Sequence, residues 1–310
     1  IWEQYDHMIT RNVISQMGGN ASVIKTNTDH QAIAVTTDCN IFYCDIDPYE
    51  GALQAVAESY RNLISVGARP LALTNCLNFG NPEKNIIMGQ FVNSIKGINR
   101  ASKKLKLPIV SGNVSFYNET NDNNIPPTPQ IGAVGVIEDY RKVISYNSFE
   151  LSDNIYLIGT PGSHLSCSAY ERCFYDYKDI KRNSIPPKVN LEDEQYNGEF
   201  ISKLINDKII SACHDISDGG LLIALVEMCL INKCSISFSK KFQSHSFLFG
   251  EDQSRYIVSV SDIKLKDFEK KIKTTKIQYT KIGRIMDSKI INFADKSFIN
   301  IDELEKLNKL

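Results

Sequence analysis

The stretch VSGNVSFYNET, residues 110–120, joins the end of an apolar segment to an unusually long polar run. Ile109 and Val110 predict the end of a buried strand. The residues that follow them are mostly small or polar: Ser111, Gly112, Asn113, Ser115, Asn118 and Glu119. A strand normally leaves a sheet through a turn of two or three residues, so a longer polar segment at this point indicates that the strand end holds a ligand.

Three residues in this stretch suit a ligand-binding role. Gly112 has no Cβ, so a ligand can approach its backbone closely. Asn113 offers a neutral amide oxygen, which suits Mg²⁺ beside phosphate oxygens. Ser115 offers a hydroxyl group. The alternative interpretation is a turn capped by its own Asn and Ser side chains, and the stretch alone leaves both interpretations open.

Working outward, the residues on the N-terminal side predict alternating strands and helices. A strand is predicted over residues 31–37, ending at Asp38. A helix follows in which Asp47 is the N-cap, Pro48 takes the first helical position and Glu50 completes a capping box. Gly67 fits the left-handed end of that helix. Its predicted buried face consists of Leu53, Val56, Ala57, Tyr60, Leu63 and Ile64.

A second strand and helix are predicted next, over residues 70–76 and from Asn81 onward. The triplet Asn81-Pro82-Glu83 repeats the same capping chemistry. The apolar stripe predicted for this helix is Ile87, Phe91, Ile95, Ile98 and Leu105. A further strand is predicted near residues 130–137.

Two more predicted strand ends run into polar loops, TTDCN at 36–40 and TNCLNFGN at 74–81. Asp38 could bind Mg²⁺, although an Asp at a strand end is also a common turn or cap residue. Asn75 is the better ligand candidate of the second loop, because Asn81 is predicted to cap a helix. Loops of this kind are where α/β and α+β sheets place their ligands.

A polar segment over about 139–152 predicts a linker to a second half of the chain. Strands are predicted there at 154–159, 208–213, 255–260, 277–285 and 289–293, with a short polar helix at the end. The segment HDISDGG, 214–220, precedes an apolar helix over 221–231. It fits either an anion site at the helix N-terminus or a cap formed by Asp218.

Composition limits the class of protein. The chain has 310 residues, 42% of them hydrophobic, and a net charge of −1. These values predict two globular domains and argue against nucleic acid as a partner. No apolar run is long enough for a membrane span, and we expect no membrane partner. The eight cysteines form no C-x-x-C pair, so we expect reduced, mostly buried thiols in a cytoplasmic protein rather than a zinc site.

The residues alone therefore predict an α+β protein with a polar, Mg-nucleotide-like site at its strand ends. They do not predict a reaction. The P-loop, dinucleotide-binding, nucleophile-elbow and H-E-x-x-H patterns are all absent from the sequence. His214 alone would more often be structural than catalytic.

Eight ordered phrases resemble the phosphoribosylformylglycinamidine synthase family, and in particular the second half of its small-type synthetase subunit. The phrases are YDHMI at 5–9, TTDCN at 36–40, DPYEGA at 47–52, TNCLNFGNPEK at 74–84, SGNVSFYNET at 111–120, IPPTP at 125–129, SACHDISDGG at 211–220 and GEDQSRYIV at 250–258. The resemblance implies the two-domain α+β fold of aminoimidazole ribonucleotide synthetase. We expect a barrel-forming domain over 1–140 and a second domain over 150–310.

The resemblance also implies an activity and a set of partners. ATP activates the amide oxygen of formylglycinamide ribonucleotide, and ammonia from a glutaminase subunit displaces phosphate to form the amidine. This ATP-dependent carbon–nitrogen ligase reaction belongs to purine biosynthesis and uses glutamine as the amide donor. A small third subunit completes the complex.

Family roles transfer where the motifs match. The resemblance assigns ATP (or ADP) binding to Asn75 and Gly112, and substrate contact to Ser115. It assigns Mg²⁺ binding to Asn113, and to Asp38 by analogy with the wider superfamily. Many relatives have Asp where this chain has Asn75, and a neutral amide would bind a metal or a ribose hydroxyl differently.

No catalytic residue is expected in this chain, because the family's catalytic histidine lies in the first half of the subunit. The chain starts at Ile1, without an initiator methionine and inside a motif, so we expect a C-terminal part whose N-terminal half is its missing partner. Alone it is expected to make no product and to form homodimers through exposed strand edges. The alternative function is a structural half that holds Mg-nucleotide in a non-catalytic pseudo-active site. Selenophosphate synthetase, thiamine-monophosphate kinase and a hydrogenase-maturation protein are rival assignments within the superfamily.

Overall fold

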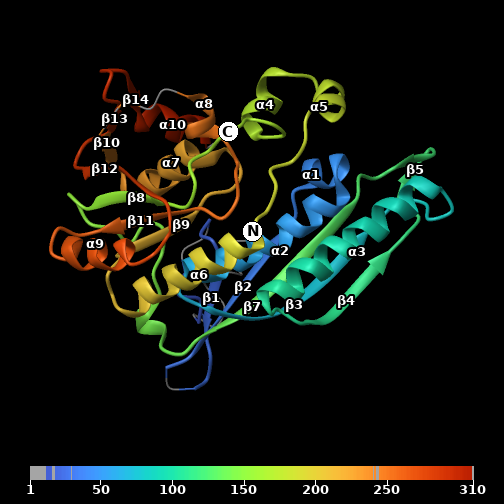
Figure 1. Ribbon diagram of the computed structural model, residues 1–310, viewed down its shortest axis with the longest axis horizontal. Coiled ribbons are helices and arrows are strands. Elements are labelled where there is room, and N and C mark those ends of the chain that lie inside the picture. The colour runs from blue at the N-terminus through green and yellow to red at the C-terminus, as the bar shows by residue number, and fades with distance from the viewer. Residues whose placement is uncertain (1–11, 16–17, 29, 240, 242–243, 309–310) are drawn as a thin grey trace.

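The structure is a computed structural model that describes residues 12–15, 18–28, 30–239, 241 and 244–308 (Figure 1). The phrase YDHMI therefore lies outside the described residues. The first part of the chain forms β1 Ser22–Lys25, β2 Ala32–Asp38, α1 Ile41–Ile46, α2 Pro48–Ser65, β3 Arg69–Asn78, α3 Asn85–Leu105, β4 Ile109–Ser115, β5 Glu119–Thr120, β6 Asn123–Asn124 and β7 Thr128–Ile137.

The second part of the chain follows a short 3-10 turn. Its elements are η2 Tyr140–Lys142, β8 Asn154–Ile158, α4 Ala169–Phe174, α5 Tyr177–Asn183, α6 Leu191–Asn206, β9 Ala212–Asp215, α7 Gly220–Asn232, β10 Ser235–Phe238, α8 His245–Phe249, β11 Tyr256–Val260, α9 Leu265–Lys273, β12 Tyr279–Met286, β13 Ile290–Asn292, β14 Phe298–Asn300 and α10 Ile301–Asn308. In the part of the chain that is described, no helix combines the length and apolar character that crossing a lipid bilayer requires.

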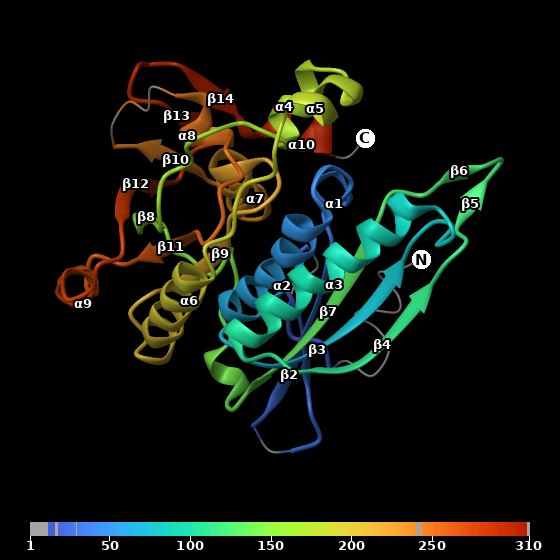
Figure 2. The ribbon, with the colours of Figure 1, turned by 45° about the vertical axis from the view of Figure 1, so that its right-hand side comes forward.

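Two large sheets organise these elements. The first has the order β1-β2-β7-β3-β4, and the second has the order β14-β13-β10-β12-β8-β11-β9. In the first sheet only β3 and β4 are parallel neighbours; the other pairs are antiparallel. Helices α2 and α3 cover one face of this sheet, as Figure 2 shows. The predicted α+β class is thereby confirmed.

The main core lies between the two sheets. Alternate residues of the second sheet, including Tyr156, Ile158 and Val258, point into the same apolar cluster as Leu63 and Leu73 of the first part. The residues between them, such as Ile155 and Ile257, face α7 in a second cluster. This alternation is what strands covered on both faces require. The layers are therefore sheet, helices, sheet, helices.

Helix α2 is predicted correctly at both ends. The Asp47 side chain accepts hydrogen bonds from the amides of Tyr49 and Glu50, and Pro48 opens the helix. Gly67 has φ +83° and follows the last turn. The capping box is wrong, because the Glu50 carboxylate accepts from the Val189 amide, 2.6 Å away, instead of returning to the cap.

Helix α3 starts four residues later than predicted, at Asn85. Asn81 instead belongs to a turn that the small β5–β6 hairpin holds in place. Its amide donates to Asn124 Oδ1 at 2.6 Å, and its side chain lies 3.4 Å from Glu119 Oε1. Ile95 of the predicted stripe is 38% exposed, whereas Ile87, Ile98 and Leu105 are buried as predicted. The strand predicted at 208–213 forms at Ala212–Asp215.

Candidate functional site

The stretch 110–120 does not follow a buried strand, because its first six residues belong to the edge strand β4 itself. Ile109 and Val110 are 41% and 69% exposed, so the prediction that they end a buried strand is wrong. The reason is the pairing pattern: among the described strands, β4 has a neighbour on one side only, β3. The polar residues therefore lie on an open sheet edge.

The register of β3 and β4 brings four of the predicted ligand residues together. Asn75 lies opposite Gly112, Cys76 opposite Asn113, and Asn78 opposite Ser115. A Cβ atom on Gly112 would lie 2.3 Å from Asn75 Oδ1, so only glycine leaves the Asn75 amide where it is. The two residues predicted to bind ATP are thus in direct contact.

The plane of the sheet separates these residues into two sets. Side chains alternate along a strand, and residues directly opposite each other share a face. Asn75 pairs with buried Ile131, so it and Gly112 face the helices. Asn113 and Ser115 take the opposite face, where the Thr74 and Ser111 hydroxyls lie 2.8 Å apart. A ligand that contacts both sets must reach around the edge of β4.

Ser115 is part of a side-chain-capped turn, which was the alternative to a ligand site in this stretch. Asn118 Nδ2 donates to Ser115 Oγ at 3.1 Å and to the Ser115 carbonyl at 3.0 Å. The predicted self-capped turn therefore exists, and it fixes the direction of the Ser115 hydroxyl. The turn ends at Glu119, which forms a 3.0 Å ion pair with Lys84.

Asp38 lies apart from this edge. It ends β2, which is separated from β3 by β7, about 10 Å across the sheet. Its carboxylate accepts from Ser59 Oγ at 2.7 Å and from Asn62 Nδ2 at 2.9 Å, both on α2. Burial raises the pKa of Asp38 from 3.8 to about 6, the Ser59 hydrogen bond lowers it, and the negative Asp215 raises it further. Asp38 and Asn113, the two residues predicted to bind Mg²⁺, therefore lie on different strands of the first sheet, β2 and β4.

Asp38 instead belongs to an acidic cavity of about 500 Å³ between the two halves. Glu58, Asp215 and Glu227 also line it. Burial raises the pKa of Glu58 well above its usual value, and the charges of Asp38 and Asp215 raise it further. Burial likewise raises the pKa of Asp215, against the lowering effect of Arg61. These carboxylates compete for positive charge, whether a proton or a cation.

Arg61 supplies part of that charge from the middle of α2. Its Nη1 atom lies 2.6 Å from Glu194 Oε1, and its Nε atom lies 3.8 Å from Asp215 Oδ2. The Arg61 and Glu194 side chains are completely buried. Sequence reasoning missed Arg61, Glu58 and Asn62. The available signal was their helical spacing, which puts these three polar residues on one side of α2, where Glu58 and Asn62 line the cavity.

Asn20 is the other residue that sequence reasoning missed. Its amide group donates to Asn62 Oδ1 at 3.1 Å and also to Asp215 Oδ1, and its Oδ1 atom lies 3.0 Å from His214 Nδ1. His214 Nε2 lies 3.1 Å from Glu227 Oε2. His214 is therefore held among polar partners inside the molecule, which agrees with a structural role.

Of the two interpretations left open for HDISDGG, the cap formed by Asp218 is not found. Asp218 accepts from Asn40 Nδ2 at 3.0 Å instead of capping α7. The N-cap is Gly219, whose φ of +80° a side chain would strain. The Gly219 amide donates to Glu251 Oε1 at 2.7 Å. A carboxylate of the chain itself thus occupies the amide that an anion would need.

Two residues predicted to bind Mg²⁺ carry suitable donor oxygens, each in its own part of the first sheet. Asp38 and Asn113 offer the carboxylate and amide oxygens that Mg²⁺ prefers. Among the residues that the structure describes, no three His, Cys, Asp or Glu side chains converge as a metal site. Any ion would therefore need oxygen ligands from a nucleotide, from water or from another chain.

Comparison with known proteins identifies relatives over nearly the whole chain. The description "AIR synthase related protein, N-terminal domain" matches residues 18–137, and "AIR synthase related protein, C-terminal domain" matches residues 152–296. The chain is 41% identical, over 99% of its length, to phosphoribosylformylglycinamidine synthase subunit PurL of Pelagibacter ubique. It is 44% identical, over 94% of its length, to the subunit of the same name from Azorhizobium caulinodans.

The chain spans only 42% and 39% of those two relatives, so it is about two fifths of their length. Among solved structures, Thermotoga maritima PurL complexed with FGAR superimposes with a TM-score of 0.78 at 18% identity. That match covers 96% of this chain and 49% of the Thermotoga chain. At this identity the structural likeness establishes the fold, whereas the sequence relatives establish the kinship.

Proposed function

Because the chain belongs to the AIR synthase related proteins, we propose that it is one half of the synthetase subunit of a phosphoribosylformylglycinamidine synthase. The whole subunit would convert formylglycinamide ribonucleotide, ATP and ammonia to the amidine, ADP and phosphate in purine biosynthesis. The observation that carries the proposal is identity of 41–44% to PurL subunits along at least 94% of this chain. The Thermotoga relative is described in complexes with FGAR, ATP and ADP, which supports the same ligand classes here.

The sheet edge is the proposed nucleotide site. Asn75 and Gly112 would contact ATP or ADP, since the bare Gly112 backbone lies beside the Asn75 amide. Asn113 would hold Mg²⁺ and Ser115 would contact the ribonucleotide from the opposite face. Asp38 would contribute to Mg²⁺ binding only through the neighbouring acidic cavity. Mg²⁺, when bound, neutralises phosphate charge, and the chain's own residues orient the nucleotide.

The missing half of the subunit is the proposed partner at the face of the first sheet that α2 and α3 do not cover, as far as the described residues show. This open face consists of Ile24, Ile33, Val35, Val134 and Val136, which the strand register places side by side. Ile24 and Ile33 are 38% and 41% exposed. Asn113 and Ser115 lie on the same face, so a partner sheet that covers the apolar patch would also complete their site. In its absence a second copy of the chain would take that place.

Two further subunits are proposed from the chemistry. Free ammonia would escape to solvent, so a glutaminase that releases it from glutamine must dock onto the synthetase. A small third subunit is proposed because a PurLQS assembly is described for Thermotoga maritima. We place the complex in the cytoplasm. All eight cysteines are unpaired thiols, five of them buried, which supports a reducing compartment.

The proposed domains are residues 1–140 and 150–310. Since the family's catalytic histidine belongs to the other half, this chain alone is expected to form no amidine. Product formation should appear when the other half and a glutaminase are supplied. ATP-dependent amidine formation by the purified chain alone would contradict this expectation.

Nucleotide binding is tested by the melting temperature of the chain with and without Mg-ADP. A ligand present at about 100 times its dissociation constant adds roughly 2.7 kcal/mol of stability. We expect a raised melting temperature that the Asn113→Ala variant loses. The matched control is Asn93→Ala, on the exposed face of α3, which should keep the shift. An equal shift in both variants would remove Asn113 from the site.

A further inference from the structure

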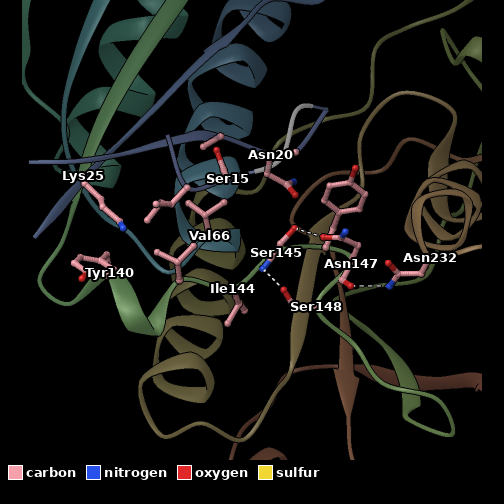
Figure 3. A pocket seen from close by; sticks show the side chains of 15 residues that line it. Ser15, Asn20, Lys25, Val66, Tyr140, Ile144, Ser145, Asn147, Ser148 and Asn232 are labelled. Atoms are coloured by element: carbon pink, nitrogen blue, oxygen red, sulfur yellow. Dashed lines mark hydrogen bonds between the residues drawn. The ribbon is translucent and has the colours of Figure 1, made fainter. Parts of the chain in front are cut away.

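A second cavity, distinct from the sheet edge, lies where the two halves of the chain meet. It has a volume of about 570 Å³ and is bounded by β1, the end of α2 at Val66, the segment 143–148 and Asn232 at the end of α7 (Figure 3). This volume falls within the range of small-molecule sites, which favour junctions between domains.

The lining of this junction cavity has a distinctive charge pattern. Of the described residues that line it, none is Asp or Glu, and Lys25 alone carries a full charge. The acidic cavity next to it has four carboxylates in its lining. An anion would therefore be repelled from the acidic cavity and accepted in the junction cavity.

The ammonium group of Lys25 lies over the aromatic ring of Tyr140. Its Nζ atom lies 4.6 Å from the centre of the Tyr140 ring, a cation–π contact that holds the ammonium group at one end of the cavity. An ammonium has three N–H donors, so those that point away from the ring remain available to a ligand. Figure 3 shows Lys25 and Tyr140 at the opposite end from Asn147 and Asn232.

The other end of the cavity is a wall of amides and hydroxyls that fix one another. Ser145 Oγ lies 2.5 Å from Asn147 Oδ1, and the Ser145 amide donates to Ser148 Oγ at 3.1 Å. Asn232 Nδ2 donates to the Asn147 carbonyl at 2.7 Å. Such a wall is pre-organised to exchange hydrogen bonds with the hydroxyl groups of a ligand.

From these features we propose that the junction cavity binds a small phosphate ester with a polyhydroxylated body, such as a sugar phosphate. The phosphate lies at Lys25 and the hydroxyl groups lie along the Ser145–Asn232 wall. This site is independent of the proposed nucleotide site, and its occupation can be measured without any turnover.

The proposal is tested by calorimetric titration of the chain with ribose 5-phosphate. Both ends of the cavity contribute, so we expect binding at least tenfold tighter than that of ribose or inorganic phosphate. AMP serves as a fourth probe. Tighter binding of AMP than of ribose 5-phosphate would support the site and assign it to nucleoside monophosphates. The absence of binding for all phosphate esters up to about 10 mM would overturn the proposal.

Two variants locate the site. Lys25→Met keeps most of the side-chain length and removes the charge, and it should weaken ribose 5-phosphate at least tenfold. Asn232→Asp adds a carboxylate at the opposite end and removes the donor to the Asn147 carbonyl, so it should weaken ribose 5-phosphate more than ribose. Lys96→Met, on the exposed face of α3, is the matched control. Unchanged affinity in the two cavity variants would place the ligand elsewhere and overturn the assignment.

Discussion

Arg61 Nη1 and Glu194 Oε1 lie 2.6 Å apart, and neither side chain is exposed to solvent. Arg61 comes from α2, beneath the first sheet, and Glu194 comes from α6, beside the second. An ion pair withdrawn from water this completely stabilises a fold only while both partners are present. Its loss therefore has a measurable cost.

The first prediction concerns this pair. Arg61→Met should lower the free energy of unfolding by about 3–5 kcal/mol, because Glu194 and Asp215 would keep buried charges without their cation. Denaturation in urea measures this. The matched control is Arg69→Met, which removes the exposed Arg69–Glu138 pair and should cost at most about 1 kcal/mol. Equal losses in the two variants would contradict the role given to Arg61.

The raised pKa of Asp38 predicts that the free energy of unfolding depends on pH. Its pKa is raised in the folded state to about 6, from 3.8, chiefly by burial. The folded protein therefore holds a proton that the unfolded chain releases. The stability from this group is fully present below about pH 4 and is lost as the pH rises to about 6. The expected slope is at most about 1.4 kcal/mol per pH unit.

The Asp38→Asn variant isolates that contribution. Ser59 and Thr36 can reverse their hydroxyl groups to accept from the new amide, so the fold should be kept. Urea denaturation between pH 4 and pH 7 should show a flatter profile for the variant than for the parent chain. Parallel profiles would mean that Asp38 is charged throughout this range.

Gly112 gives a prediction about the sheet edge. A Cβ added by Gly112→Ala would lie 2.3 Å from Asn75 Oδ1, so the Asn75 side chain must rotate away. Mg-ADP affinity should fall at least tenfold, while stability changes by no more than about 1 kcal/mol, because the strand edge is exposed. Gly89→Ala on α3 is the control, since its Cβ meets no atom within 4 Å. If calorimetry finds the same Mg-ADP affinity in Gly112→Ala as in the parent chain, a contact between the nucleotide and Asn75 is excluded.

The open face of the first sheet predicts self-association. Ile33→Lys places a charge at the centre of the apolar patch, next to Ile24 and Val136. The parent chain should show dimers by light scattering, and the variant should be monomeric with little change in melting temperature. Ile263→Lys, at an isolated position that is 89% exposed, should leave the dimer intact. A parent chain that stays monomeric at every concentration would count against the proposed coverage of this face.

The sequence predicted best what depends on neighbours along the chain. The Asp47 cap, Pro48 and Gly67 were placed correctly because each acts within one helical turn. The start of α3 was wrong because Asn81 takes its partners from the distant β5–β6 hairpin. The burial of Ile109 was wrong because a strand becomes an edge strand only through the pairing of the whole sheet.

The site shows the same division. Asn75 and Gly112 were assigned to one ligand from their motifs, and the register places them together. The meeting of Asp38 with Asp215 could not be predicted, because the two residues are far apart in sequence and meet only when the halves pack. Asn75 and Asn113 lie on opposite faces of the sheet because side chains alternate along a strand. This rule can be applied only once residues 109–115 are known to form a strand.

The shared core has a consequence for movement. Leu63, Leu73, Tyr156 and Val258 belong to one apolar cluster between the sheets, and the Arg61–Glu194 pair crosses it. A hinge between the halves would have to pull this cluster apart and hydrate two buried charges. We therefore expect the two halves to move together, so that a partner chain on the open face of the first sheet would move against both of them as one body.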